Sequence, residues 1–358
     1  MTPGRHIGGA QSGRGELTER EELVLRYIVQ HYILTTTPVG SRYLSKRLEE
    51  EAISAATIRN TMADLEEKGF ISHPHTSAGR VPTDRGYRFY VDTIARMSRL
   101  SDAERLTIRD NIRTTVATPM LMKEASRILG LISNQLGIIA APELLNSTLE
   151  QIELVPLGST RLLVVLSLQA GMVRTVTLEV HQEIVRDRLD AIVSVLNERL
   201  AGLTLRVIRT TFRDRIRDVS VAADDGIVQL LTDSVETIFD EAPGIERVQL
   251  SPTQNLLRQP EFASPEQMRG IVELIEDEEM VIHLLDSHPG ASETVEVTIG
   301  AEHGNERLVN YSLLTTRYQV GEATGTIGLI GPKRMDYARL ISVVAYIAET
   351  ITNNFQDR

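Results

Sequence analysis

The stretch Ser54–Ile71, SAATIRNTMADLEEKGFI, decides the fold of the N-terminal part of this chain. Its apolar residues recur at helical spacing, it begins with a serine suited to cap a helix, and a glycine follows its last polar run. This pattern predicts a helix over residues 54–68, with Ser54 as its N-cap. Ile58, Met62 and Leu65 then face a core, and the opposite face is polar or small.

Two further helices are predicted before this one. Thr18 and Glu21 have the spacing of a capping box, and the apolar residues that follow keep a helical period until the threonine run before Pro38. A short second helix is predicted over residues 41–48, with Ser41 as its N-cap. Three helices with a tight connection between the last two are typical of a helix-turn-helix core.

The segment after the third helix has the composition of a β-hairpin. Residues 72–82 are rich in turn-forming residues and are flanked by short apolar pieces, which predicts a two-stranded wing. A linking helix is predicted from residue 83 or 84 to about residue 99. We therefore expect a winged helix-turn-helix domain over residues 17–100, preceded by a glycine-rich, disordered tail over residues 1–16.

The outward face of the third helix has the chemistry of base recognition. Arg59 can donate two hydrogen bonds to guanine, and Asn60 can pair with adenine, each contact being worth roughly 1–3 kcal/mol of discrimination. The basic residues of the second helix are placed for phosphates, and Arg80 at the wing turn for a minor groove. The candidate DNA-contacting residues are Arg42, Lys46, Arg47, Ser54, Thr57, Arg59, Asn60, His75, Thr76, Ser77, Arg80 and Arg85.

Charge is distributed unevenly along the 358 residues, whose formal net charge is −11. Residues 1–99 carry 14 Lys and Arg against 12 Asp and Glu, a net charge of +2, whereas residues 100–358 carry 24 against 37, a net charge of −13. A basic-leaning head on an acidic remainder allows one part to approach phosphates while the rest is repelled by them.

The remainder of the chain alternates between helical and strand-like patterns, and it contains no internal repeat. A helical block interrupts what is otherwise an α+β arrangement, so we expect a multidomain α+β protein. The predicted helices are 102–116, 119–135, 185–200, 227–238 and 336–352, and the predicted strands are 152–156, 161–168, 173–180, 293–299, 309–316 and 325–330.

The sequence lacks the motifs typical of catalytic, metal and nucleotide sites. His73 and His75 have H-x-H spacing, but no cysteine or clustered carboxylate completes a metal site, so no metal or other cofactor is expected. The glycines of residues 325–331 lack the spacing of a phosphate loop. No nucleophile elbow or zinc-protease motif is present, and the acidic runs are typical of solvated faces, so we do not expect an enzyme.

The absence of cysteine excludes disulfide bonds and thiol chemistry and is compatible with a reducing compartment. No apolar run approaches the roughly 18 residues of a membrane helix, and the N-terminus lacks a signal-peptide core. We therefore expect a cytoplasmic protein without a membrane partner.

Three runs in the head, PVGSRYLSKRL, SAATIRNTMADLEEKGFI and HPHTSAGRVPTDRGYRFYVD, resemble the HrcA family of bacterial heat-inducible transcription repressors. The resemblance covers Pro38–Asp92 nearly throughout, and Gly325–Ile341, GTIGLIGPKRMDYARLI, resembles a second family signature. This chain departs from the family at Glu49–Glu51, where the turn is normally weakly charged, and at Ala55, where proline is usual.

The resemblance implies a GAF-like regulatory domain over residues 101–181 and 249–358, with an inserted, largely helical dimerisation region over residues 182–248. It also implies a homodimer that binds an inverted-repeat operator in double-stranded DNA and represses chaperone operons of the GroE or DnaK type. Repression would be lost on heat stress, and a GroE-type chaperonin would keep the repressor active. The alternative is a winged-helix regulator controlled by a small ligand in the GAF-like domain.

Overall fold

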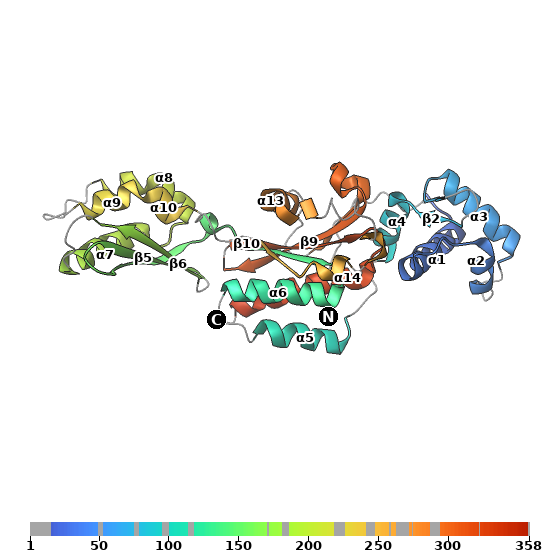
Figure 1. Cartoon of the computed structure of the whole chain (residues 1–358), viewed down its shortest axis with the longest axis horizontal. Helices are drawn as coiled ribbons and strands as arrows, with labels where there is room; N and C mark the ends of the chain where they lie inside the picture. Colours follow the sequence, from blue (N-terminus) through green and yellow to red (C-terminus); the bar gives the residue numbers. More distant parts are fainter. Residues whose placement is uncertain are drawn as a thin grey trace.

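The computed structural model forms an elongated molecule with three parts in a row (Figure 1). We call them the head (residues 16–94), the body (residues 100–140 and 248–356) and the insert (residues 141–240). The structure describes residues 16–48, 53–74, 79–94, 100–113, 118–169, 172–180, 186–217, 226–240, 248–257, 259–262, 272–273, 275–286, 294–321 and 323–356.

The head contains three helices, a two-stranded antiparallel ribbon and a fourth helix that leads towards the body. The ribbon pairs Ile71 with Pro82 and Ser72 with Val81. The elements of the head are α1 (Glu19–Thr35), α2 (Ser41–Arg47), α3 (Ala55–Glu67), β1 (Ile71–Ser72), β2 (Val81–Pro82) and α4 (Asp84–Ile94).

The helix starts in the head follow the sequence signals with one exception. The capping box at Thr18 and Glu21 is confirmed, since the Thr18 amide donates to the Glu21 carboxylate over 2.8 Å. The prediction that Ser41 caps α2 is wrong by one residue, because Gly40 is the N-cap and Ser41 is already helical. Val39 forms an isolated β-bridge with Arg80, and Gly40 directly after it is the extended residue from which the helix starts.

The body is built on a five-stranded antiparallel sheet with the order β7-β3-β10-β9-β8. Helices α6 and α14 cover one face, α5 packs on the outer side of these two helices, and α13 lies on the other face of the sheet (Figure 1). The strands are β3 (Leu136–Ala140), β7 (Val248–Leu250), β8 (Glu296–Ile299), β9 (Tyr311–Val320) and β10 (Ala323–Pro332). The helices are α5 (Asp102–Arg113), α6 (Thr118–Ser133), α11 (Gln254–Leu257), α13 (Glu278–Asp286) and α14 (Tyr337–Gln356), with 3₁₀ turns at Pro260–Phe262, Gly300–His303 and Glu306–Leu308.

The insert has its own sheet. Three antiparallel strands in the order β4-β5-β6 pack their alternating buried side chains against the helices that follow. Asn197 on α7 exchanges hydrogen bonds with both backbone groups of Ile152, which satisfies part of the edge of β4. The elements are a 3₁₀ turn (Leu144–Asn146), β4 (Leu149–Pro156), β5 (Arg161–Leu168), β6 (Met172–Glu179), α7 (Arg186–Leu200), α8 (Leu205–Ile216), α9 (Ile227–Asp233) and α10 (Val235–Phe239).

This topology corrects the predicted boundary of the inserted region. The strands within residues 149–179 were expected in the body, but among the described residues they pair with one another and not with the body sheet. The excursion therefore begins after β3 and ends before β7, a wider span than 182–248. Because β3 and β7 are antiparallel neighbours, with Ala140 opposite Val248, both ends of the insert leave the body side by side.

None of the helices in the described ranges is long and apolar enough to cross a membrane.

Candidate nucleic-acid interface

Helix α3 has the two faces that its sequence predicts. Ile58, Met62 and Leu65 are buried in the core of the head. The Ser54 hydroxyl accepts a hydrogen bond of 3.1 Å from the Thr57 amide, which confirms Ser54 as the N-cap. The hydroxyl of Ser54 also lies 2.9 Å from that of Thr57, so both candidate side chains help to start the helix.

The opposite face of α3 is open to solvent. Arg59 and Asn60 are exposed, and Ala56 and Ala63 beside them are small and also exposed. Within the described part of the chain, neither polar side chain has a hydrogen-bond or ion-pair partner. The guanidinium and the amide thus keep their full capacity to bond to a ligand, and the alanines allow a close approach to the helix.

Helix α2 adds three exposed cations next to this face. Its Leu44 is buried together with Leu48, which fixes the helix on the core of the head. The ring of Tyr43 lies 4.1 Å from that of His31 on α1, and this contact also holds α2 in place. Among the described residues none of the three cations is ion-paired, so their charge is available to phosphates. These cations are Arg42, Lys46 and Arg47.

Arg80 is held in a different way from the one expected at a wing turn. Its guanidinium forms an ion pair of 2.8 Å with Glu66 at the end of α3 and lies 2.8 Å from His73 Nδ1, and only 21% of the side chain is exposed. Its backbone pairs with Val39. In this structure Arg80 fastens the ribbon to α3 and does not extend towards a minor groove.

Arg85 also has partners inside the head. It donates a hydrogen bond of 2.7 Å to the Lys68 carbonyl, reaches Glu16 over 3.1 Å and lies 4.5 Å above the ring of Phe70. Because the Lys68 carbonyl belongs to the end of α3, Arg85 satisfies an otherwise orphaned acceptor there. Half of its side chain remains exposed.

The predicted contacts at His75, Thr76 and Ser77 lie outside the described residues, as does the acidic turn Glu49–Glu51. The candidate DNA-contacting residues that the structure describes divide into two groups. One group, on α2 and on the outward face of α3, is solvent-facing and free of ion pairs. The other group, Arg80 and Arg85, holds the ribbon and α4 against α3.

The head contains an ion pair between the buried carboxylate of Glu21, which the sequence indicated only as a capping residue, and the exposed Lys68. Glu21 is buried and receives Lys68 Nζ over 2.8 Å. Burial alone would raise the pKa of Glu21, but the hydrogen bonds from Lys68 and Thr18 outweigh it and lower the pKa. The carboxylate therefore stays ionised and connects the start of α1 to the end of α3.

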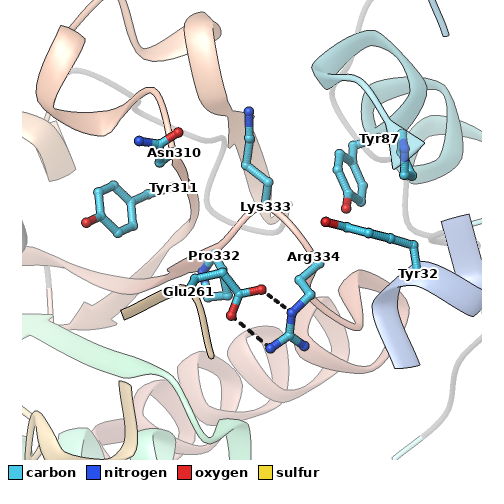
Figure 2. Close-up of a pocket in the computed structure, with 9 residues that line it drawn as sticks. Tyr32, Tyr87, Glu261, Asn310, Tyr311, Pro332, Lys333 and Arg334 are labelled. Atoms are coloured by element: carbon cyan, nitrogen blue, oxygen red, sulfur yellow. Dashed lines mark hydrogen bonds and ion pairs between the residues drawn. The ribbon is translucent and has the colours of Figure 1, made fainter. Parts of the chain in front are cut away.

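A cavity of about 170 Å³ lies between the head and the body (Figure 2). Tyr32 and Tyr87 line it from the head, and Arg334 from the body is ion-paired with Glu261 at its floor. Burial raises the pKa of both tyrosines, so their hydroxyls are neutral at neutral pH. The further lining residues are Pro82, Asn310, Tyr311, Pro332 and Lys333.

Comparison with known proteins identifies the family. Residues 120–341 match the model of the HrcA protein C-terminal domain. The heat-inducible transcription repressor HrcA of Chlorobium chlorochromatii is 42% identical over 94% of this chain and 97% of its own length. That of Chlorobium phaeobacteroides (strain BS1) is 39% identical over 95% of this chain and 98% of its own. The crystal structure of a hypothetical protein superposes with a TM-score of 0.61 at 25% identity, covering 96% of this chain and 99% of that one.

The head carries an exposed basic face, and relatives named as transcription repressors match this chain over nearly its whole length. The protein is therefore a regulator of transcription and not an enzyme. The chain belongs to the HrcA family of heat-inducible transcription repressors.

Proposed function

We propose that this chain represses transcription by placing α3 in the major groove of an operator, with the head acting as a winged helix-turn-helix domain. The observation that carries the proposal is the outward face of α3, where Arg59 and Asn60 are exposed and have no protein partner among the described residues. The α2 cations supply affinity for phosphates, and α3 supplies discrimination between bases. We place the protein in the cytoplasm, where its DNA is.

The repressor is proposed to act as a homodimer paired through the insert. Side chains that alternate with the buried ones of β4, β5 and β6 form the second face of that sheet, where a group of apolar residues lies among polar ones such as Glu153, Thr175 and Thr177. Val155 and Val173 on this face are 39% and 63% exposed, and Leu163 and Val165 between them are half-buried. A second copy of the sheet would cover these side chains and give the two-fold symmetry that an inverted repeat requires.

The regulated genes are proposed to be chaperone operons of the GroE or DnaK type, with repression lost on heat stress and a GroE-type chaperonin maintaining activity. The names of the relatives, heat-inducible repressors, support a thermal response. A marginally stable body that exposes apolar surface when warmed is a suitable substrate for a chaperonin. The body is proposed to be GAF-like in fold.

A small ligand in the body is the second candidate, and the cavity is the observation that bears on it. The cavity lies between the head and the body, and not inside the body sheet. Its cations are already matched by carboxylates, Arg334 by Glu261 and Lys333 by Asp84. This arrangement does not favour a ligand-controlled regulator over the first candidate.

The proposal is tested by mobility-shift and footprinting assays on the DNA upstream of a chaperonin operon from the same genome. We expect two protected half-sites related by two-fold symmetry and spaced by one helical turn, about 34 Å, or a multiple of it. Protection of a single half-site at saturating protein would contradict the dimer. Equal affinity for unrelated DNA would contradict sequence-specific binding.

A further inference from the structure

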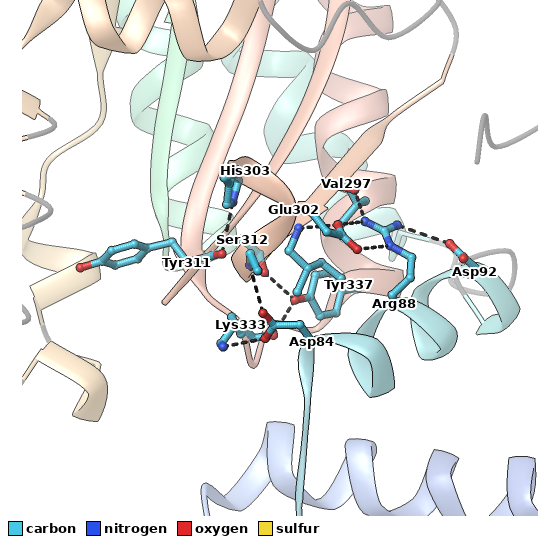
Figure 3. Close-up of polar contacts among 12 residues, drawn as sticks. Asp84, Arg88, Asp92, Val297, Glu302, His303, Tyr311, Ser312, Lys333 and Tyr337 are labelled. Carbon is cyan, nitrogen blue, oxygen red and sulfur yellow. Dashed lines mark hydrogen bonds and ion pairs between the residues drawn. The ribbon is translucent and has the colours of Figure 1, made fainter. Parts of the chain in front are cut away.

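Two sequence runs that resemble the family, Pro38–Asp92 and Gly325–Ile341, meet in space between the head and the body. The second run is not explained by DNA binding, since it lies in β10, the following loop and α14. The loop brings Lys333 against Asp84, the first residue of α4, with 2.6 Å between Nζ and the carboxylate (Figure 3). The other carboxylate oxygen of Asp84 accepts a hydrogen bond of 3.0 Å from the Ala301 amide.

One turn further along α4, Arg88 makes a second set of contacts with the body. Its guanidinium binds both oxygens of Glu302 and donates to the Val297 carbonyl (Figure 3). Residues four apart lie on one face of a helix, so Asp84 and Arg88 present a single surface of α4 to the body. Because the contacts lie at two points along α4, they restrict its direction as well as its position.

The body approaches α4 closely at Gly300. A Cβ on this glycine would lie 2.1 Å from the Asp84 carboxylate, and its φ of +56° also favours glycine. The contact between Asp84 and the Ala301 amide therefore depends on a residue without a side chain at position 300.

A third contact reaches α1. Arg334, held by Glu261 and Gln259, donates a hydrogen bond of 3.3 Å to the carbonyl of Ile33 in the last turns of that helix. The ring of Tyr337 lies 6.2 Å from that of Tyr87 on α4. The body thus contacts two helices of the head, and both belong to the core on which α3 is packed.

We propose that Asp84, Arg88, Glu302, Lys333 and Arg334 form a junction clamp that sets the direction in which α3 is presented to DNA. They are positioning residues, because they lie away from the outward face of α3 and act through α4 and α1. The ion pairs of Asp84 and Arg88 with the body are partly exposed, so each is weak and the clamp can open without unfolding either part. The inference rests on the proposed binding of a paired operator, since only a dimer needs its two heads at a fixed separation and angle.

The test compares the wild-type chain with the variant Arg88→Met/Lys333→Met on three DNAs: a single half-site, the operator, and operators with altered half-site spacing. For the variant we expect unchanged affinity for the half-site. Its affinity for the operator should fall about tenfold or more, because the advantage of simultaneous contact by two heads is lost. Its affinity should also depend less on the spacing between half-sites. Arg339→Gln is the matched control, because Arg339 pairs with Glu104 over 2.6 Å wholly inside the body. It should leave all three results unchanged.

A second measurement does not depend on DNA. The chain has no cysteine, so Glu67→Cys on α3 and Met120→Cys on α6, both exposed, give two unique sites for spin labels. Excess unlabelled chain is added so that only the distance between the two labels of one chain is measured. The distribution of this distance should be narrow in the wild-type background and broad in the Arg88→Met/Lys333→Met background. Equal distributions and equal spacing dependence would overturn the clamp. A wild-type chain that binds no inverted repeat would instead overturn the proposed function, while a broadened distribution would still support the clamp.

Discussion

Arginines of similar appearance in the sequence have different roles in the head. Arg59 is exposed on α3 and has no partner in the part of the chain that the structure describes. Arg80 is tied to Glu66, and Arg85 to the Lys68 carbonyl. Helical periodicity separates inward from outward positions on α3, which is why Arg59 could be assigned in advance. A residue in or after a hairpin has no such period, so the partners of Arg80 and Arg85 became clear only from the fold.

Arg59→Ala and Lys46→Ala should have different effects on DNA binding. We expect Arg59→Ala to lose roughly 1–3 kcal/mol of preference for the operator over a site changed at one guanine, because a bidentate base contact is removed. Lys46→Ala should weaken binding to all sequences and reduce the salt slope by about one unit, because a phosphate contact is removed. Affinities measured across a salt series on both DNAs separate the two effects. An equal loss of discrimination in both variants would contradict the facing of α3.

Glu21→Gln should destabilise the junction of α1 and α3 in a pH-dependent way. The pKa of Glu21 is lowered in the folded chain, so the ionised carboxylate stabilises the fold above its ordinary value of 4.5. This contribution is lost as pH falls through the lower, folded value. We expect the variant to cost about 1–3 kcal/mol at neutral pH and progressively less below pH 4.5.

Amide hydrogen exchange in α1 and α3 measures this difference locally. Glu19→Gln on the exposed start of α1 is the matched control and should show a much smaller effect at every pH. If the difference in local stability between wild type and Glu21→Gln stays constant down to the lowest pH, the ionised pair is not the cause of that difference.

At the scale of elements, the local signals predicted most helices well. The start of α3 at its serine cap, the capping box of α1 and the exact extent of β5 follow from the sequence. The predicted helix over 227–238 is instead two helices, broken at Ser234. Strand β3 was missed because its short apolar run, LGIIA, directly follows a helix and is buried on both faces, so it does not alternate.

Sheet membership was less predictable than strand position. Alternation along β5 shows that one face is buried, but it does not show which sheet the strand joins. The pairing of β4, β5 and β6 with one another depends on contacts with α7 to α10, which lie later in the chain. The junction clamp was unpredictable for the same reason, because its partners are separated by more than 200 residues.

Gly86→Ala should destabilise the head although alanine favours helices. Gly86 lies in α4, and a Cβ there would be 2.2 Å from the backbone oxygen of Phe70. Neither backbone can move without separating α4 from Phe70, the residue before β1, so the clash should outweigh the gain of roughly 1 kcal/mol in helix propensity. The thermal midpoint should fall. Gly40→Ala has open space and should change stability by less than about 1 kcal/mol.

At the scale of the whole molecule, the insert lies at the opposite end from the head (Figure 1). Contacts made there can affect DNA binding only by pairing two chains or by acting through the body. Because of this distance, a substitution on the insert sheet leaves the outward face of α3 untouched. The proposed subunit pairing and the proposed DNA binding can therefore be altered separately.

Val173→Glu should separate the proposed dimer while leaving each chain folded. Val173 is 63% exposed on the second face of the insert sheet, so a carboxylate there would be buried, and costly, only in the proposed paired state. We expect a monomer by light scattering and a loss of operator affinity of about a hundredfold, with half-site affinity retained. Val207→Glu, on α8 and 39% exposed, is the control and should remain dimeric. A dimeric Val173→Glu chain would contradict pairing through this face.

The neighbouring positions of β3 and β7 have a consequence for how such repressors can diverge. Because the chain leaves and re-enters the body at adjacent antiparallel strands, the insert takes the place of a simple hairpin and can be exchanged as a cassette without altering the sheet register on either side. If the insert selects the partner subunit, swapping it would produce two regulators in one cell that recognise the same operator but never mix their subunits.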